Sequence, residues 1–134
     1  MTGVSPGDEL PPLHRLVTRA DVAAYADASG DLNPLHLDDD VARSAGFPGI
    51  VAHGMFTMGH LAACLVGWAG DPAAVIALTA NFRAPVFVGE EIVAGGRVVA
   101  VEGGFATLET WVRVEREGRT EWPVKRGSAR VLLA

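Results

Sequence analysis

Residues 54–68, with the sequence GMFTMGHLAACLVGW, form the most apolar stretch of the chain. The stretch predicts a helix that begins at Gly54 and ends before the turn residues Gly70-Asp71-Pro72. Apolar side chains occur on nearly every side of this helix, so we expect the protein to bury most of it. It is shorter than the roughly 20 residues that a membrane span needs, and Gly59, His60 and Gly67 interrupt it. The segment is therefore expected to be a core helix.

Four segments after this helix are predicted to be β-strands, because they are rich in Val, Thr or aromatic residues and partly alternate. They span residues 75–82, 92–101, 105–114 and 124–133. Helices followed by a run of strands predict an α+β protein with an antiparallel sheet. An all-round apolar helix beside a long sheet favours a sheet that curls around the helix. Such a sheet keeps an edge strand, which is expected to pair with a second copy.

The first third of the chain predicts one short strand and two helices. The strand covers residues 13–17. Thr18 and Asp21 form a short variant of the capping box, so a helix is expected to begin at Thr18, and Ser29-Gly30 ends it. A second, short helix is expected over residues 38–45, where three aspartates are favourable at the positive N-terminal end.

Composition limits the class of protein. The chain has 134 residues, of which 49% are hydrophobic and 20% are charged, which is typical of one folded domain over residues 1–134. The single cysteine, Cys64, excludes an internal disulfide and a zinc site built from cysteines. A net charge of -5 argues against nucleic-acid binding. Residues 1–12 lack the basic start and apolar run of a signal peptide, so we expect a cytoplasmic protein with no membrane association.

Positive charge is concentrated in the last part of the chain. Residues 111–134 carry the basic side chains Arg113, Arg116, Arg119, Lys125, Arg126 and Arg130 and fewer acidic ones, although the whole chain is acidic. One interpretation is a solvated outer face of the last strands. The other is a docking surface for an anionic carrier or a nucleotide phosphate.

The stretch SGDLNPLH, residues 29–36, is the first candidate for chemistry. The rigid turn Asn33-Pro34 separates Asp31 from His36, so the two side chains can converge on one point. A carboxylate and an imidazole that hold one water can take one proton and give another, as general acid–base addition of water requires. On spacing alone an alternative stays open, in which Asp31 caps the turn and His36 is an ordinary surface histidine.

The second candidate, residues 52–56, opens the apolar helix. A helix N-terminus presents free N–H groups, and Gly54 lets a ligand approach the backbone closely. An oxyanion that develops on a thioester carbonyl would be stabilised there. In the alternative, Gly54 only relieves crowding, and His53 caps the helix or packs. A third segment, residues 82–91, is expected to be a strand end, a loop and a return strand without chemistry of its own.

Together the three segments resemble the MaoC-type dehydratases, which include the (R)-specific enoyl-CoA hydratases. The resemblance rests on the motifs Asp31-x-Asn33-Pro34-x-His36, Ala52-His53-Gly54-Met55 and Pro85-Val86-x-x-Gly89-Glu90. It covers residues 18–101, and residues 29–68 are most similar to the catalytic beta subunit of the mycobacterial (3R)-hydroxyacyl-ACP dehydratase. One position departs from the pattern, since some members carry a serine where this chain has Ala62.

The resemblance implies a hot-dog fold, in which an antiparallel sheet wraps around a long central helix. It implies a homodimer, or a heterodimer with another hot-dog chain, with acyl tunnels near the interface. Asp31 and His36 would be catalytic, the Gly54 N–H would bind the substrate oxyanion, and Asn33 would orient the loop. The implied reaction interconverts (3R)-3-hydroxyacyl thioesters of CoA or acyl carrier protein (ACP) with trans-2-enoyl thioesters and water.

Two other functions stay open at this point. In the first, the chain is a subunit that needs a different hot-dog chain to supply the acyl-binding pocket. In the second, it is a hot-dog thioesterase. Asp31, His36 and Asp38 have the residue types for a divalent metal. Hydration needs neither a metal nor another cofactor, so neither is expected. His60 is expected to be a structural histidine of the apolar helix.

Overall fold

A computed structural model describes residues 3–134. The strands are β1 (Leu13–Leu16), β2 (Val75–Thr79), β3 (Glu91–Glu102), β4 (Phe105–Arg116) and β5 (Arg119–Leu132). The helices are α1 (Arg19–Ser29), α2 (Asp39–Ser44) and α3 (Gly54–Ala69), with 3-10 turns η1 (Pro34–His36) and η2 (Pro72–Ala74). Helices therefore precede the long strands, as expected.

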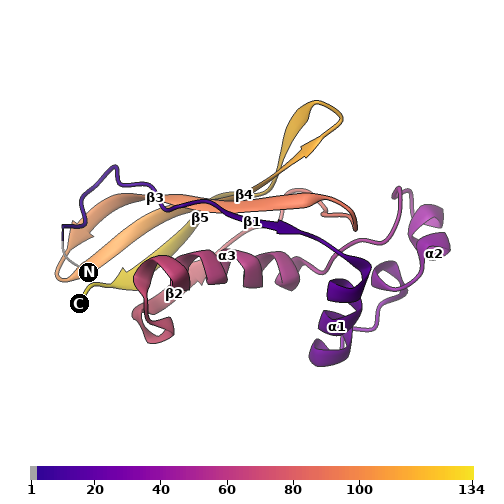
Figure 1. The fold of residues 1–134 in the computed structure, drawn as a ribbon, viewed down its shortest axis with the longest axis horizontal. Coiled ribbons are helices and arrows are strands. Elements are labelled where there is room, and N and C mark those ends of the chain that lie inside the picture. The colour runs from indigo at the N-terminus through magenta and orange to yellow at the C-terminus, as the bar shows by residue number, and fades with distance from the viewer. Residues whose placement is uncertain (1–2) are drawn as a thin grey trace.

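The strands form one antiparallel sheet in the order β1-β3-β4-β5-β2. Figure 1 shows α3 lying along one face of this sheet, with α1 and α2 beyond one end of it. The core lies between α3 and the sheet, where Leu61 and Leu65 pack with Val98, Leu108 and Val124, all of them almost fully buried. The expected α+β class, with an antiparallel sheet curled over one long helix, is confirmed.

Local signals place the short helices as expected. Asp21 N–H donates to Thr18 Oγ1 at 3.1 Å, and Thr18 N–H donates to the Asp21 carboxylate at 3.4 Å, which is the predicted capping box. The Thr18 hydrogen bond also lowers the pKa of Asp21. Gly30 ends α1 in the left-handed conformation with φ of 75°, which favours glycine. Asp38 caps α2, so that helix begins one residue later than expected.

We expected most of α3 to be buried, but the structure buries only the side of the helix that faces the sheet. Thr57, Leu61 and Leu65 face the sheet and are buried. Gly59, Ala63 and Gly67 lie on the other side and are exposed, because within a single chain the sheet covers one side of the helix.

The β4–β5 hairpin is longer than the sequence predicted. We expected the last strand to begin at residue 124, but β5 begins at Arg119 and pairs through Arg116↔Arg119. The turn residues Glu117 and Gly118 both have positive φ, as type I′ hairpin turns require. The prediction was wrong here because charged residues hide the alternation and because Pro123 normally argues against a central strand. In the structure Pro123 falls between the pairs Val112↔Val124 and Val114↔Glu121, where the register shifts.

The strand after α3 is shorter than expected. β2 ends at Thr79, whereas the sequence predicted residue 82. Phe82 still forms an isolated antiparallel bridge with Val124 of β5, and Arg83 N–H donates to the Pro123 carbonyl at 2.9 Å. The backbone of Phe82 is therefore held beside β5 and close to the first turn of α3.

Candidate active site

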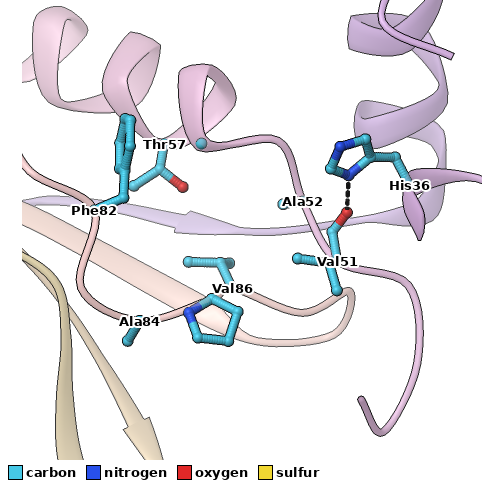
Figure 2. Close-up of a pocket in the computed structure, with 9 residues that line it drawn as sticks. His36, Val51, Ala52, Thr57, Phe82, Ala84 and Val86 are labelled. Carbon is cyan, nitrogen blue, oxygen red and sulfur yellow. Dashed lines mark hydrogen bonds between the residues drawn. The ribbon is translucent and has the colours of Figure 1, made fainter. Parts of the chain in front are cut away.

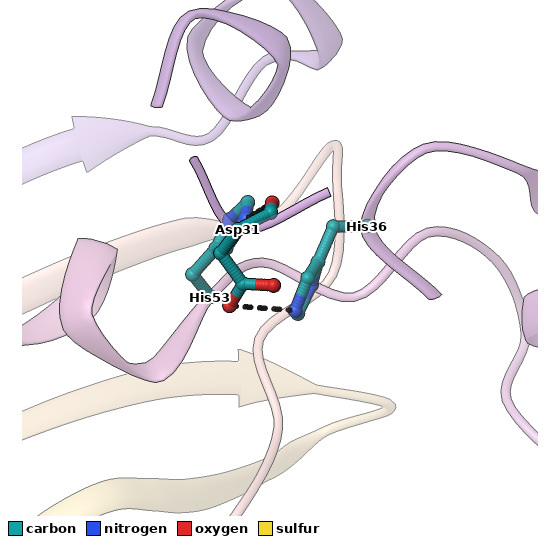
Figure 3. Close-up of side chains that lie close together, drawn as sticks. All are labelled: Asp31, His36 and His53. Atoms are coloured by element: carbon teal, nitrogen blue, oxygen red, sulfur yellow. Dashed lines mark hydrogen bonds and ion pairs between the residues drawn. The ribbon is translucent and has the colours of Figure 1, made fainter. Parts of the chain in front are cut away.

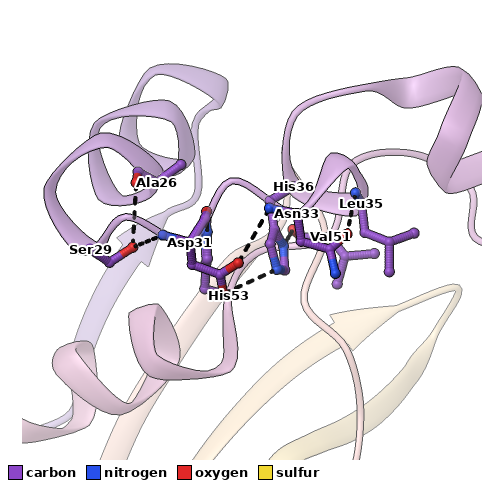
Figure 4. Close-up of polar contacts among 8 residues, drawn as sticks. All are labelled: Ala26, Ser29, Asp31, Asn33, Leu35, His36, Val51 and His53. Carbon is purple, nitrogen blue, oxygen red and sulfur yellow. Dashed lines mark hydrogen bonds and ion pairs between the residues drawn. The ribbon is translucent and has the colours of Figure 1, made fainter.

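The loop after α1 is shaped by its own short-range hydrogen bonds (Figure 4). Asp31 N–H donates to Ser29 Oγ at 3.1 Å, and Asn33 N–H donates to Asp31 Oδ1 at 3.3 Å. Asn33 Oδ1 in turn accepts from Leu35 N–H at 3.0 Å, where η1 begins. Side chains of Asn and Asp that bind the backbone two residues on produce such tight turns. The sequence Ser-Gly-Asp-Leu-Asn-Pro thus determines the path of the loop.

His36 is anchored by a backbone carbonyl. Its Nδ1 lies 2.5 Å from the carbonyl oxygen of Val51, and Leu35 O accepts from Val51 N–H at 3.0 Å. A carbonyl oxygen can only accept a hydrogen bond. Nδ1 of His36 therefore carries a proton and donates a hydrogen bond to the Val51 carbonyl. The other ring nitrogen, Nε2, is left to face Asp31.

Asp31 and His36 converge as the sequence predicted (Figure 3). Asp31 Oδ2 lies 3.9 Å from His36 Nε2, and the exposed fractions of the side chains are 55% and 14%. This distance is too long for a direct hydrogen bond. A water oxygen about 2.8 Å from each atom would span such a separation. The pair can therefore hold one water between a carboxylate and an imidazole.

His53 also belongs to this cluster, although its contact with His36 was not expected from the sequence. Its ring stacks on His36, with centroids 3.7 Å apart and planes inclined by 23°. Its Nε2 lies 3.0 Å from the backbone carbonyl of Asp31, while its side chain makes no capping bond to α3. His53 is only 2% exposed, and its Nδ1 has no hydrogen-bond partner among residues 3–134. His53 thus links the Asp31 backbone to the His36 ring.

The first residue of α3 offers a free backbone donor. Within residues 3–134, Gly54 N–H makes no hydrogen bond, since the first turn of α3 is bonded only from Phe56 and Thr57 onward. Free N–H groups and the helix dipole favour negative charge at this end. The aromatic ring of Phe82 lies against Gly54, and a Cβ at position 54 would be 3.1 Å from two ring carbons. A side chain at position 54 would therefore push the Phe82 ring back by a few tenths of an ångström.

Two pockets meet at Gly54 and Phe82, which line both. The first, which we name the acyl pocket after the acyl group that the resemblance to MaoC-type dehydratases implies, has a volume of about 340 Å³ and is lined by His36, Val51, Ala52, Gly54, Thr57, Phe82, Ala84, Pro85 and Val86. The second, which we name the Asp31 pocket, has a volume of about 280 Å³ and is lined by Tyr25, Ser29, Asp31, His53, Gly54, Met55 and Phe82. Figure 2 shows His36 and Phe82 on opposite sides of the acyl pocket. Most of its walls are apolar.

The third sequence segment forms one wall of the acyl pocket. Arg116 donates to both carboxylate oxygens of Glu90 at 2.7 Å and to the Pro85 carbonyl at 2.9 Å. The hydrogen bond with Glu90 raises the pKa of Arg116. Glu90 also accepts from Phe87 N–H at 2.8 Å, which closes the loop around Val86. These bonds hold the lining residues Pro85 and Val86 in place, and the absence of chemistry in this segment stays a prediction.

Most basic side chains of the last strands make local contacts. Arg116 is paired with Glu90, while Arg113, Lys125 and Arg130 lie over the rings of Trp111, Trp122 and Phe105. Such contacts with aromatic faces stabilise cations at an outer strand surface. This arrangement favours the interpretation of a solvated strand face. The docking alternative stays a prediction.

The cluster of Asp31, His36 and His53 has the composition of a metal site, with candidate ligand atoms within 4.8 Å of one another. The expected third member, Asp38, instead caps α2, where its Oδ1 accepts from Asp40 N–H at 2.8 Å. The rings of His36 and His53 are stacked, with their planes inclined by 23°. Imidazole ligands must point their lone pairs at one ion about 2.0–2.1 Å away. The expectation that the site needs no metal stays a prediction.

No helix within residues 3–134 is both long enough and apolar enough to cross a membrane. The cytoplasmic location expected from the sequence stays a prediction.

Comparisons of this chain with a family model and with curated proteins agree on one family. The model of the MaoC like domain matches residues 4–119. The (R)-specific enoyl-CoA hydratase of Aeromonas caviae is 38% identical over 95 residues, which are 68% of this chain and 70% of that protein. The 3-hydroxybutyryl-CoA dehydratase of Methylorubrum extorquens is 39% identical over 79 residues, 58% of this chain and 50% of that protein. This chain spans about half the length of the first curated relatives that it matches.

A solved structure supports the same comparison. The structure described as the (R)-hydratase from A. caviae involved in PHA biosynthesis superposes with a TM-score of 0.88 at 29% identity, over 100% of both chains. The hot-dog fold that the resemblance implied is confirmed. The closer likeness to a mycobacterial beta subunit stays a prediction.

Proposed function

The chain belongs to the MaoC-like domain family, and we propose that it is an (R)-specific hydratase of trans-2-enoyl thioesters, which also dehydrates (3R)-3-hydroxyacyl thioesters. The observation that carries the proposal is the separation of 3.9 Å between Asp31 Oδ2 and His36 Nε2. His36 lines the acyl pocket and Asp31 lines the neighbouring one, so water can meet an acyl group between them.

In the hydration direction, the Asp31 carboxylate takes a proton from the bridging water as the water oxygen bonds to C3. Protonated His36 gives its Nε2 proton to C2, while Nδ1 keeps its own proton and its hydrogen bond to Val51 O. The reaction leaves Asp31 protonated and His36 neutral, and transfer of one proton between them restores the starting state. Dehydration reverses these steps. Positioned acids and bases of this kind contribute about 10²–10⁴-fold in rate.

Three further residues support the pair. The Gly54 N–H at the start of α3 donates to the thioester oxygen as it becomes an enolate. Removing one such donor typically costs about 10²–10³ in rate. Asn33 orients the catalytic loop through its bond to Leu35 N–H. His53 is a positioning residue, because it holds the Asp31 backbone and stacks on His36.

The substrate is a thioester of CoA or of ACP. The acyl pocket, at about 340 Å³, lies at the small end of the range of ligand pockets, which favours short acyl groups. Its mostly apolar walls suit a hydrocarbon chain.

The partner is a second hot-dog chain. Within residues 3–134, β2 pairs on one side only, with β5, so its other edge is free. Ile76 on β2 is 52% exposed, and the exposed side of α3 also lacks polar cover. Free edges and apolar surface of this kind favour pairing with another chain. The partner is either a second copy of this chain or a different hot-dog chain that completes the acyl-binding pocket.

The test is an assay of the purified chain alone with trans-2-enoyl-CoA substrates of four to ten carbons. We expect loss of the conjugated enoyl absorbance, no release of free thiol, and a 3-hydroxyacyl product of (R) configuration by chiral chromatography. Thiol release without hydration would identify the thioesterase alternative. Activity that appears only after addition of another hot-dog chain would identify the dependent subunit.

A further inference from the structure

The first turns of α3 carry a buried hydroxyl group without a hydrogen-bond partner. Thr57 is only 2% exposed, and no hydrogen bond among residues 3–134 involves its hydroxyl. The next buried polar side chain of α3, His60, is satisfied in contrast, because its Nε2 lies 2.8 Å from the Leu13 carbonyl oxygen. Burial of a hydroxyl without a partner is unfavourable, so the Thr57 hydroxyl calls for a physical explanation.

The Thr57 side chain opens into the acyl pocket. Thr57 lines this pocket together with His36 and Gly54. Figure 2 shows its hydroxyl oxygen pointing into the pocket and away from the Phe82 ring. The walls of the pocket are mostly apolar, so a hydroxyl that points into it is available to a polar atom of a bound ligand.

The spacing of Thr57 and Gly54 places two donors on one side of the helix. Residues three apart in an α-helix lie on the same face, with about 5–6 Å between their Cβ positions. Side chains of a helix also lean toward its N-terminus, so the Thr57 hydroxyl is directed toward the turn that begins at Gly54. A single oxygen atom about 2.9 Å from each donor can bridge a gap of this size.

Resting on the proposed function, we propose that the Thr57 hydroxyl is the second oxyanion donor of this site and acts beside the Gly54 N–H. Both groups donate hydrogen bonds to the thioester oxygen as negative charge develops on it. The hydroxyl keeps its proton, and Asp31 and His36 carry out the proton transfers. In the free protein the hydroxyl is held ready in the pocket, where it costs no rearrangement when the enolate forms.

The experiment compares Thr57→Val with wild type in the hydration of crotonyl-CoA. Valine has nearly the same shape but lacks the hydroxyl, and kcat should fall about 10²-fold, as for the loss of one oxyanion donor. The Tm should stay at the wild-type value or rise, because the change removes no hydrogen bond of the folded chain. Binding of butyryl-CoA by calorimetry should change far less than kcat, since the donors act mainly on the charged oxygen.

Thr110→Val is the matched control. Thr110 is also buried with a hydroxyl that lacks a partner among residues 3–134, but it lies on β4 and lines neither pocket. This variant should keep the wild-type kcat. Thr57→Ser, which retains the hydroxyl, should recover most of the activity that Thr57→Val loses.

Two outcomes overturn the role of Thr57. One is a Thr57→Val protein with the kcat of wild type. The other is a Thr57→Ser protein that loses as much activity and Tm as Thr57→Val, because the side chain would then serve packing alone. Wild-type protein that hydrates no enoyl thioester would instead overturn the proposed function itself, and the role of Thr57 with it.

Discussion

Replacing Gly54 by alanine tests the oxyanion site with a single added methyl group. Gly54 has no left-handed φ, so alanine can adopt its backbone conformation. The new Cβ would lie 3.1 Å from two ring carbons of Phe82 and 3.5 Å from a third. Ordinary carbon–carbon contacts are about 3.5–4.0 Å, so the ring must retreat by a few tenths of an ångström. The exposed position of Phe82 allows this movement.

The stability change should therefore be small. A displaced rotamer costs about 0.5–1.5 kcal/mol. Alanine regains up to about 1 kcal/mol of helix propensity, although less at the first position of a helix. The two effects oppose each other, so we expect the Tm to move by no more than about 4 °C.

The Gly54→Ala change should lower kcat/KM strongly, although it leaves the Tm nearly unchanged. Misplacing a reacting group by about 1 Å can cost about 10² in rate, so kcat/KM on crotonyl-CoA should fall about 10–100-fold. The assay pairs scanning calorimetry with steady-state hydration. If the loss comes from the displaced ring, the double variant Gly54→Ala/Phe82→Ala should recover part of it. A folded Gly54→Ala protein with wild-type kcat/KM would refute the placement of the carbonyl at this N–H.

Three further predictions address the Asp31–His36 pair, the free edge of β2 and the buried side chain of His60. His36→Gln should lower kcat about 10²–10⁴-fold, and combining it with Asp31→Asn should cost far less than the product of the two losses, because both groups act on one water; fully multiplicative losses would argue against a shared site. Ile76→Arg should shift the chain from dimer to monomer in sedimentation equilibrium, whereas an unchanged dimer would place the interface elsewhere. Burial lowers the pKa of His60 from 6.5. As the pH falls, the His60 imidazole of the unfolded chain is therefore protonated at a higher pH than that of the folded chain. The free energy of unfolding should then decrease as the pH drops below about 6.5. His60→Gln should flatten that decline in denaturant titrations, and an equal slope would exclude His60 as its cause.

Features set by neighbouring residues were predictable from the sequence. The capping box of Thr18 and Asp21, the stop at Gly30 and the bounds of α3 depend on contacts within a few positions. The approach of Asp31 to His36 is of the same kind, because the turn between them is made by hydrogen bonds of its own residues.

Features set by contacts between distant segments were not predictable. His53 reaches the site because α3 begins beside the Asp31 loop, and its sequence neighbours give no sign of the stacked ring on His36. Phe82 reaches Gly54 only because its backbone bridges β5 beyond the end of β2. The early start of β5 depends on its pairing with β4, which overrides the weak strand propensity of a charged segment containing Pro123.

The central claim is that Asp31 and His36 act together on one water, and the hydration of crotonyl-CoA by Asp31→Asn tests it most directly. Asparagine keeps the shape of the side chain but cannot take the proton. The matched control is Asp27→Asn, an exposed aspartate on α1 outside both pockets. We predict that Asp31→Asn keeps the wild-type Tm and loses at least about 10² of kcat, while Asp27→Asn retains full activity. A folded Asp31→Asn protein that keeps more than about half of the wild-type activity would contradict the account.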